Sequence, residues 1–211
     1  GTNYSGSIKN GKMEGNGVLE VPDKYKYEGE FKNGIKEGTG IILFENRESY
    51  HGEWKFGKKE GFGAYVFSCG FEYLGNFKSD KMHGEGVLRM SDKESFSGVW
   101  ENGKIQGLGT HFREDGSKFT GEYTKGEPNG SGMIVWESKD TMRGNWNEGL
   151  LEDLSHFQFE NGSSIIQFWK KGKIQKKAVY IQKDGFNISG SPDKLVTLLL
   201  ESNLSNNDSV E

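Results

Sequence analysis

Residues 50–63, YHGEWKFGKKEGFG, hold the motif that decides the fold. An aromatic residue, a glycine and a second aromatic residue stand at alternate positions, as Tyr50, Gly52 and Trp54. Alternate residues of a β-strand point to the same face of its sheet. The motif therefore predicts a strand that carries two rings and a glycine slot on one face, followed by a return strand that opens with Gly61 and Gly63.

The motif returns every 23 residues without insertion or deletion, and repeat positions 1–23 are counted here from its first aromatic residue. Thirty-one of the 32 glycines fall at five of these positions. Such self-similarity indicates a repeat protein. Position 1 is always aromatic or large and apolar: Tyr4, Tyr27, Tyr50, Tyr73, Phe96, Phe119, Met142, Ile165 and Ile188.

Turn residues separate the predicted strands. Asn33-Gly34 stands between the two strands of one repeat, and both residue types tolerate positive φ. Asp115-Gly116 marks a second kind of turn, which leads into the next repeat. The sequence thus predicts an all-β repeat or solenoid fold, a single-layered, twisted antiparallel sheet of tandem 23-residue β-hairpins.

The pattern divides the chain into three parts. Residues 4–187 form eight repeats, of which the last two are degenerate because Asp153 and Ser155, then Lys176 and Ala178, replace the glycines of positions 12 and 14. Residues 188–204 are expected to form a partial repeat and a short capping helix that starts near Ser191, where proline follows a serine N-cap. A helix that docks into a partner is the alternative. Residues 205–211 are polar and are expected to be disordered.

The segment 50–63 resembles the consensus of the MORN (membrane occupation and recognition nexus) repeat family, and the resemblance extends over about residues 4–190. It implies an elongated, single-layered sheet that forms a groove. It also implies a role in tethering proteins to one another or to membranes. Repeats of this family sometimes precede an enzyme domain, so an accessory module of a larger enzyme is a further alternative.

Aromatic residues on one face offer rigid contact area for a partner, in the form of an extended or helical segment. Rings stacked over glycines would also supply the core of such a sheet, and that structural role is the alternative. The residues predicted to bind a partner protein are those of the middle repeats: Tyr50, Trp54, Tyr73, Phe77, Phe96, Trp100, Phe119 and Tyr123.

Charge is segregated along the chain. The net charge of −4 argues against a nucleic-acid partner, which normally meets a basic face. Residues 169–177 nevertheless contain five lysines and no acid, which predicts a contact with anionic phospholipid or with an acidic partner; a solvated hairpin tip is the alternative. These lysines are Lys170, Lys171, Lys173, Lys176 and Lys177.

No residues stand at the spacing of a catalytic or metal site. The four histidines are dispersed, and Cys69 is the only cysteine. The Gly-x-Gly pairs lack the lysine and serine of a phosphate-binding loop. We therefore expect a non-enzymatic scaffold without metal or cofactor, in the cytoplasm and in association with cytoskeleton or membrane. Association of two copies of the chain into a homodimer is the alternative to a monomer.

Overall fold

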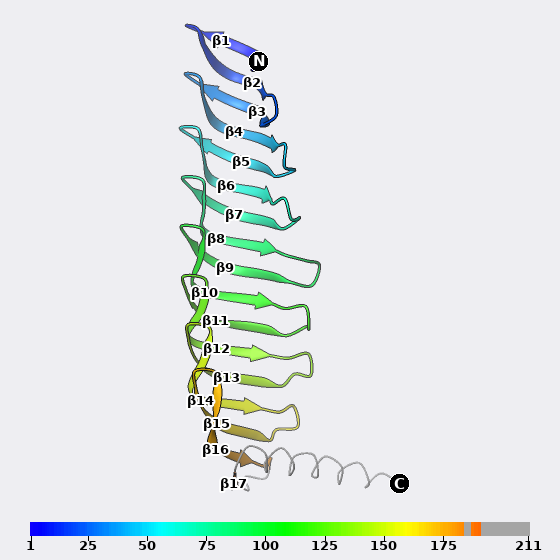
Figure 1. The fold of residues 1–211 in the computed structure, drawn as a ribbon, viewed down its shortest axis with the longest axis vertical. Coiled ribbons are helices and arrows are strands. Elements are labelled where there is room, and N and C mark those ends of the chain that lie inside the picture. The colour runs from blue at the N-terminus through cyan, green and yellow to red at the C-terminus, as the bar shows by residue number, and fades with distance from the viewer. Residues whose placement is uncertain (184–186, 191–211) are drawn as a thin grey trace, which may run out of the picture. The chain divides into compact units, whose positions relative to one another are not determined.

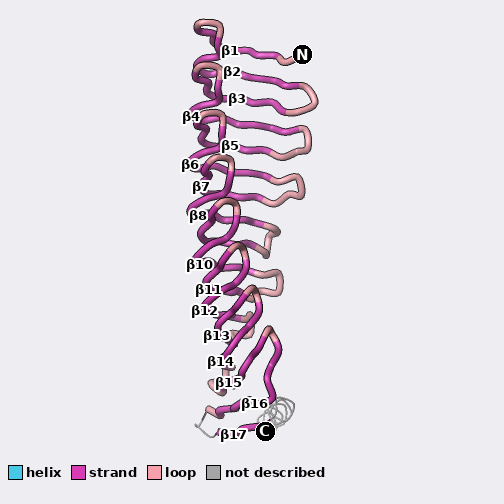
Figure 2. Tube along the Cα trace, turned by 60° about the vertical axis from the view of Figure 1, so that its left-hand side comes forward, coloured by secondary structure: helices cyan, strands magenta, loops and turns pink. Residues whose placement is uncertain are grey.

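The computed structural model describes residues 1–183 and 187–190, and its two compact units, residues 1–112 and 113–211, are considered one at a time. The described part contains strands and turns and no helix (Figures 1 and 2). The strands of unit 1 are β1 (Asn3–Lys9), β2 (Lys12–Val21), β3 (Tyr25–Lys32), β4 (Ile35–Phe44), β5 (Ser49–Lys55), β6 (Lys58–Val66), β7 (Glu72–Lys78), β8 (Lys81–Arg89), β9 (Ser95–Glu101) and β10 (Lys104–Phe112). Those of unit 2 are β11 (Lys118–Thr124), β12 (Glu127–Val135), β13 (Thr141–Asn147), β14 (Leu150–Gln158), β15 (Ser164–Lys170), β16 (Lys173–Ile181) and β17 (Asn187–Gly190).

Within each unit, every strand pairs antiparallel with the strand that follows it. Each 23-residue repeat contributes one hairpin with a tight turn, and a wider turn leads to the next repeat. The predicted all-β fold of tandem antiparallel hairpins is confirmed. The helix expected near Ser191 and the tail 205–211 lie outside the described residues.

The tight turns join each repeat to the one before it. Asn33 and Gly34 both have positive φ, 51° and 82°, as the Asn-Gly pair predicts. The Gly34 N–H donates to the Met13 carbonyl at 2.8 Å, and the Asn33 N–H donates to the Glu14 carboxylate at 2.9 Å. Gly57 repeats the backbone bond on Lys36 at 2.9 Å. These turns therefore satisfy backbone donors on the preceding repeat.

A bulge follows each tight turn in unit 1. The glycine at position 12, such as Gly38 with φ 66° or Gly61 with φ 59°, adopts the left-handed conformation that only glycine takes without strain. In unit 2 the degenerate repeat places Asp153 there at φ 60°, and aspartate is among the residues that tolerate this conformation.

The glycines at positions 3 and 14 face one another across the strands. In unit 1 they form an unbroken column through all ten strands, because each pairs with the next. A position-1 ring lies over each pair: a Cβ on Gly63 would meet the Tyr50 ring atoms at 2.5–2.7 Å. The members of this glycine column are Gly6, Gly17, Gly29, Gly40, Gly52, Gly63, Gly75, Gly86, Gly98 and Gly109.

The core of unit 1 is a chain of aromatic rings over this column. Tyr50 meets Trp54 of its own repeat edge-to-face at 5.3 Å and Phe77 of the next repeat at 5.0 Å, and Tyr73 repeats the pattern with Phe77 and Trp100. Buried polar atoms are paired within the same layer. The Tyr50 hydroxyl donates to the Glu53 carbonyl at 2.9 Å, and Trp54 Nε1 donates to the Gly40 carbonyl at 3.2 Å.

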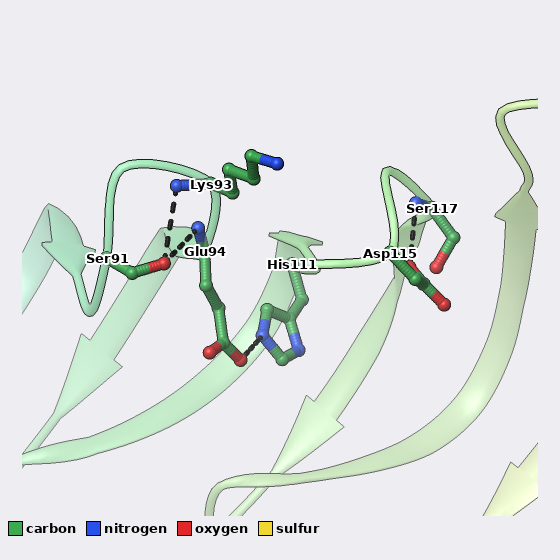
Figure 3. Close-up of polar contacts among 6 residues, drawn as sticks. All are labelled: Ser91, Lys93, Glu94, His111, Asp115 and Ser117. Carbon is green, nitrogen blue, oxygen red and sulfur yellow. Dashed lines mark hydrogen bonds and ion pairs between the residues drawn. The ribbon is translucent and has the colours of Figure 1, made fainter.

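The wider turns are held by local side chains (Figure 3). In unit 1, Ser91 Oγ accepts the N–H groups of Lys93 and Glu94, and Glu94 Oε1 lies 3.0 Å from His111 Nε2. In unit 2, Asp115 Oδ1 accepts the Ser117 N–H at 2.8 Å. The His111 ring is thereby assigned to a structural contact between β10 and the wider turn that precedes β9.

Replacement of a column glycine should therefore disrupt the ring layer. We expect Gly63→Ala to destabilise the protein by about 1–3 kcal/mol, because its methyl group would overlap the Tyr50 ring and the backbone around it cannot open freely. Urea denaturation measures the loss.

Gly103→Ala is the matched control for this prediction. Gly103 has φ 82° and no heavy atom within 4 Å of the added Cβ, so the control reports backbone strain alone, about 1 kcal/mol. Equal losses in the two variants would show that the ring contact does not require glycine.

Candidate functional site

A groove runs over the glycine column of unit 1, on the face opposite the rings. Across β6–β10 it is about 630 Å³ in volume, and its floor contains Gly75, Gly86 and Gly98. Apolar side chains line it and remain exposed, from 39% for Val99 to 68% for Leu108. The apolar lining consists of Phe62, Leu74, Val87, Val99 and Leu108.

Strand geometry explains the groove. Residues on either side of a column glycine point away from the ring face, because neighbours alternate between faces. Leu74 pairs with Val87, and Glu85 pairs with Val99, so side chains from successive strands form two rows with the glycine backbone between them. The rows are the walls and the side-chain-free column is the floor.

The groove changes character along unit 1. Over β2–β5 a second hollow of about 550 Å³ follows the same column, with Gly17, Gly29 and Gly40 in its floor. Its walls are mostly polar and include Glu28 and His51. Unit 1 therefore presents a polar stretch over its first strands and an apolar stretch over its last strands.

The residue at repeat position 4 differs between the polar and the apolar stretch of the groove. The Glu53 carboxylate accepts the Phe62 N–H at 2.9 Å, and Glu30 accepts the Thr39 N–H in the same way, which also lowers the Glu30 pKa. In the fifth repeat Val99 occupies this position and offers no acceptor. The groove wall is therefore apolar at this point and lacks the hydrogen bond to the backbone that a glutamate makes there in two other repeats.

The residues that line the groove were not predicted from the sequence. They lie at positions 2, 4, 13 and 15, which differ from repeat to repeat, whereas the predicted contact residues are those that the repeats share. The available signal was an apolar residue where other repeats are polar: Leu74 replaces the Glu28 and His51 of earlier repeats, and Leu108 replaces Asn16 and Thr39.

The eight aromatic residues predicted to contact a partner lie in the core. Tyr50, Trp54, Tyr73, Phe77, Phe96 and Trp100 of unit 1 are 0–6% exposed, and Phe119 and Tyr123 of unit 2 are 1% and 5% exposed. Their rings face one another rather than solvent: a position-1 ring such as Tyr50 fills the space above a glycine pair, and a position-5 ring such as Trp54 packs edge-to-face against it. This burial favours the structural alternative, and a partner contact by these rings stays a prediction.

Two lysines point into the aromatic layer of unit 1. Lys36 Nζ lies 4.4–5.0 Å from the ring centroids of Tyr25, Tyr27 and Trp54, and Lys59 Nζ lies 4.3 Å from that of Tyr65. Burial lowers the Lys36 pKa to about 8, against a partly opposing effect of the Asp80 charge, and burial also lowers the Lys59 pKa. Cation–π contacts replace much of the lost hydration.

The lysine-rich segment of unit 2 lies at a tight turn. Lys170, Lys171 and Lys173 are exposed, while Lys176 and Lys177 fall where side chains are not described. Trp169 Nε1 donates to Ser155 Oγ at 2.7 Å, so this ring is packed in the sheet. The predicted contact with anionic lipid stays a prediction.

Among the described residues, no group of three or more histidine, cysteine or acidic side chains is arranged to hold a metal ion. Cys69 is exposed in a wider turn. Over the same part of the chain, no helix has the length and apolarity required to cross a bilayer.

Comparison with known proteins identifies the family of this chain. A model of the MORN repeat matches residues 4–23, 27–48, 50–68, 73–94, 96–118 and 119–141. No curated protein matches the sequence. Among solved structures, the E1021V mutant of the TCP10 domain of CPAP from Danio rerio is similar at 11% identity and a TM-score of 0.51, over 84% of this chain and 83% of that one. This likeness concerns the fold alone.

A second solved structure is the TCP domain of SAS-4 from Drosophila melanogaster in complex with a proline-rich motif of Ana2. It is also 11% identical, with 84% of each chain covered, but its TM-score of 0.34 supports no inference.

The partly buried Lys36 gives a prediction about how the stability of the protein depends on pH. The unfolded chain binds more protons than the folded chain between the folded Lys36 pKa of about 8 and its ordinary value, so stability should rise with pH through this window. Lys36→Met should stabilise the protein by about 1–2 kcal/mol at pH 7 and flatten this rise. Methionine already stands at this position in other repeats, as Met13 and Met82.

Thermal unfolding between pH 7 and pH 9.5 measures both effects. Burial raises the pKa of Tyr50 and Tyr73 above that of free tyrosine, so these side chains stay protonated in the folded chain at pH 9.5. The upper limit also lies below the pKa of tyrosine in the unfolded chain, about 10, so the tyrosines contribute little to the pH dependence of stability. Lys58→Met, at an exposed neighbouring position, is the control. An unchanged pH dependence in Lys36→Met would contradict the assignment.

Proposed function

Because this chain belongs to the MORN repeat family, we propose that it is a non-enzymatic protein-interaction module in which the groove of unit 1 binds a segment of a partner protein. One observation carries the proposal: five apolar side chains, Phe62, Leu74, Val87, Val99 and Leu108, stay 39–68% exposed along one groove. Contiguous exposed apolar surface of this kind marks interaction sites in soluble proteins.

The groove suits a narrow, elongated occupant. Its floor is glycine backbone, so a partner can approach the sheet closely between the two side-chain rows. Covering the exposed part of each apolar side chain contributes on the order of 1 kcal/mol. A helix with one apolar stripe and an extended segment with alternating apolar residues both satisfy these walls.

The ring layer supports the groove from the other face. Its edge-to-face contacts and the Trp54 and Trp100 hydrogen bonds fix the strands, so little ordering cost is left for binding. In this proposal the rings therefore contribute to binding indirectly, because they hold the strands in place.

Attachment to a membrane is the alternative function. It rests on the exposed Lys170, Lys171 and Lys173 at one tight turn of unit 2. Each lysine near an anionic surface contributes roughly 1 kcal/mol, which is weak attachment unless a second anchor is present.

The groove proposal predicts a selective loss of binding. A displayed library of random 16-residue peptides, selected on the immobilised full chain, should yield sequences rich in apolar residues. Their affinity should fall at least about tenfold in the Leu74→Glu/Val99→Glu double variant, because a charge then enters each wall of the groove.

Leu150→Glu is the matched control, since Leu150 is 48% exposed at a tight turn of unit 2. Circular dichroism and thermal unfolding confirm that all variants stay folded. Equal binding of the selected peptides by wild type and the groove variant would refute the proposal.

A further inference from the structure

Exposed lysines gather on the tight turns of unit 1, at repeat positions 6 and 9. These turns follow one another along one side of the ladder of strands, on the left in Figure 1. We name this set the lysine edge; its members are Lys9, Lys12, Lys32, Lys55, Lys58, Lys78, Lys81 and Lys104, all of them exposed.

Three turns of the lysine edge place two lysines directly opposite one another: Lys9 with Lys12, Lys55 with Lys58, and Lys78 with Lys81. Like charges at facing positions destabilise a hairpin. No ion pair joins a member of the edge to a carboxylate in the described residues. The edge thus concentrates positive charge that the fold does not need.

Nearby carboxylates are already engaged by backbone groups. Glu14, Glu37 and Glu60 each accept the N–H of the following tight turn at 2.9 Å. Asp80 Oδ1 accepts the Lys59 N–H at 2.9 Å. Their charges weaken the field of the lysine edge, but their oxygens are oriented toward the turns.

Phe56 stands at the middle of the edge, between Lys55 and Lys58. Its side chain is 75% exposed and its φ is 52°, a conformation that the asparagines at the same position, such as Asn33 and Asn102, adopt more readily. The ring has a cation–π contact with Lys55, whose Nζ lies 6.0 Å from the ring centroid, but most of its surface is left to solvent on a strained backbone. Such a residue points to a contact made outside the chain.

We propose that the lysine edge, with Phe56 as its apolar anchor, binds an acidic segment of another protein in an extended conformation. Strands are about 4.8 Å apart, so each repeat advances the edge by about 10 Å, which is about three residues of extended chain. Five repeats span about 40 Å and fit about 12 acidic residues. The proposal concerns a surface apart from the groove and does not rest on the function proposed for it.

The geometry favours a chain over a plane of lipid headgroups. The lysines follow a line one hairpin wide, and the carboxylates of Glu14, Glu37 and Glu60 lie beside this line. A flat anionic surface would also approach these carboxylates, whereas an extended peptide can lie along the lysines, a line that Asp80 and Glu101 interrupt. An apolar residue near the centre of the peptide would contact Phe56.

The test uses a fluorescent 15-residue peptide with seven glutamates on each side of one leucine, titrated with the full chain at 50 mM and 300 mM salt. Wild type should bind, and more weakly at high salt because screening shortens the range of the attraction. Changing Lys55, Lys58, Lys78 and Lys81 to glutamine should weaken binding about tenfold. Phe56→Asn should weaken it about threefold and raise the melting temperature.

Two controls separate this surface from others. Lys170→Gln/Lys173→Gln removes a facing lysine pair from unit 2 and should leave binding unchanged. The groove variant Leu74→Glu/Val99→Glu should also bind normally, so failure of either proposal is recognised separately. Equal binding by the four-glutamine variant and wild type would overturn the proposal. Binding of phosphatidylserine vesicles but not of the peptide would overturn it as well.

Discussion

The contact between an aromatic ring and a pair of facing glycines is the one on which every regular repeat depends. The ring at position 1 occupies the volume that two Cβ atoms would need, as Tyr50 does above Gly52 and Gly63. A single-layered sheet has no second layer to bury its apolar side chains, so its rings must bury one another. Glycine makes this burial complete: Tyr27 and Tyr50 are 0% exposed although only one sheet layer lies beneath them.

The opposite face follows from the alternation of side chains along each strand. Residues at positions 3 and 14 point to the ring face, so on the other face backbone is left between the side chains of positions 2 and 4 and those of positions 13 and 15. Core and groove in unit 1 are therefore the two faces of one alternating pattern. Substitutions in the walls leave the ring layer untouched, which is why Leu74 and Val99 can differ from the residues of other repeats without loss of the fold.

The repeat period, the hairpins and the tight turns followed from the sequence, because each rests on local chemistry: alternation in strands and positive φ at Asn-Gly. The face on which a partner would bind could not be predicted from the sequence. Rings over glycines predict both a core and a contact surface, and only the burial of residues such as Trp54 and Phe77 separates the two. The packing of the Lys36 side chain against aromatic rings could not be predicted either, since a lysine in a strand is expected to be solvated unless the residues around it are known.

Shared and variable positions thus carry different information in this chain. Positions held by glycine or an aromatic ring in every regular repeat are fixed by the fold, since any other residue there collides or leaves a void. Positions that vary, such as 2, 4, 7 and 13, accept several residue types, although position 7 takes a positive φ in every tight turn of unit 1 and a glutamate at position 4 can bond to the backbone. Phe56 and Val99 each depart from the polar residue that serves the fold at its position, one at a turn and one in the groove. Departures of this kind are expected where a repeat protein has a function beyond its fold.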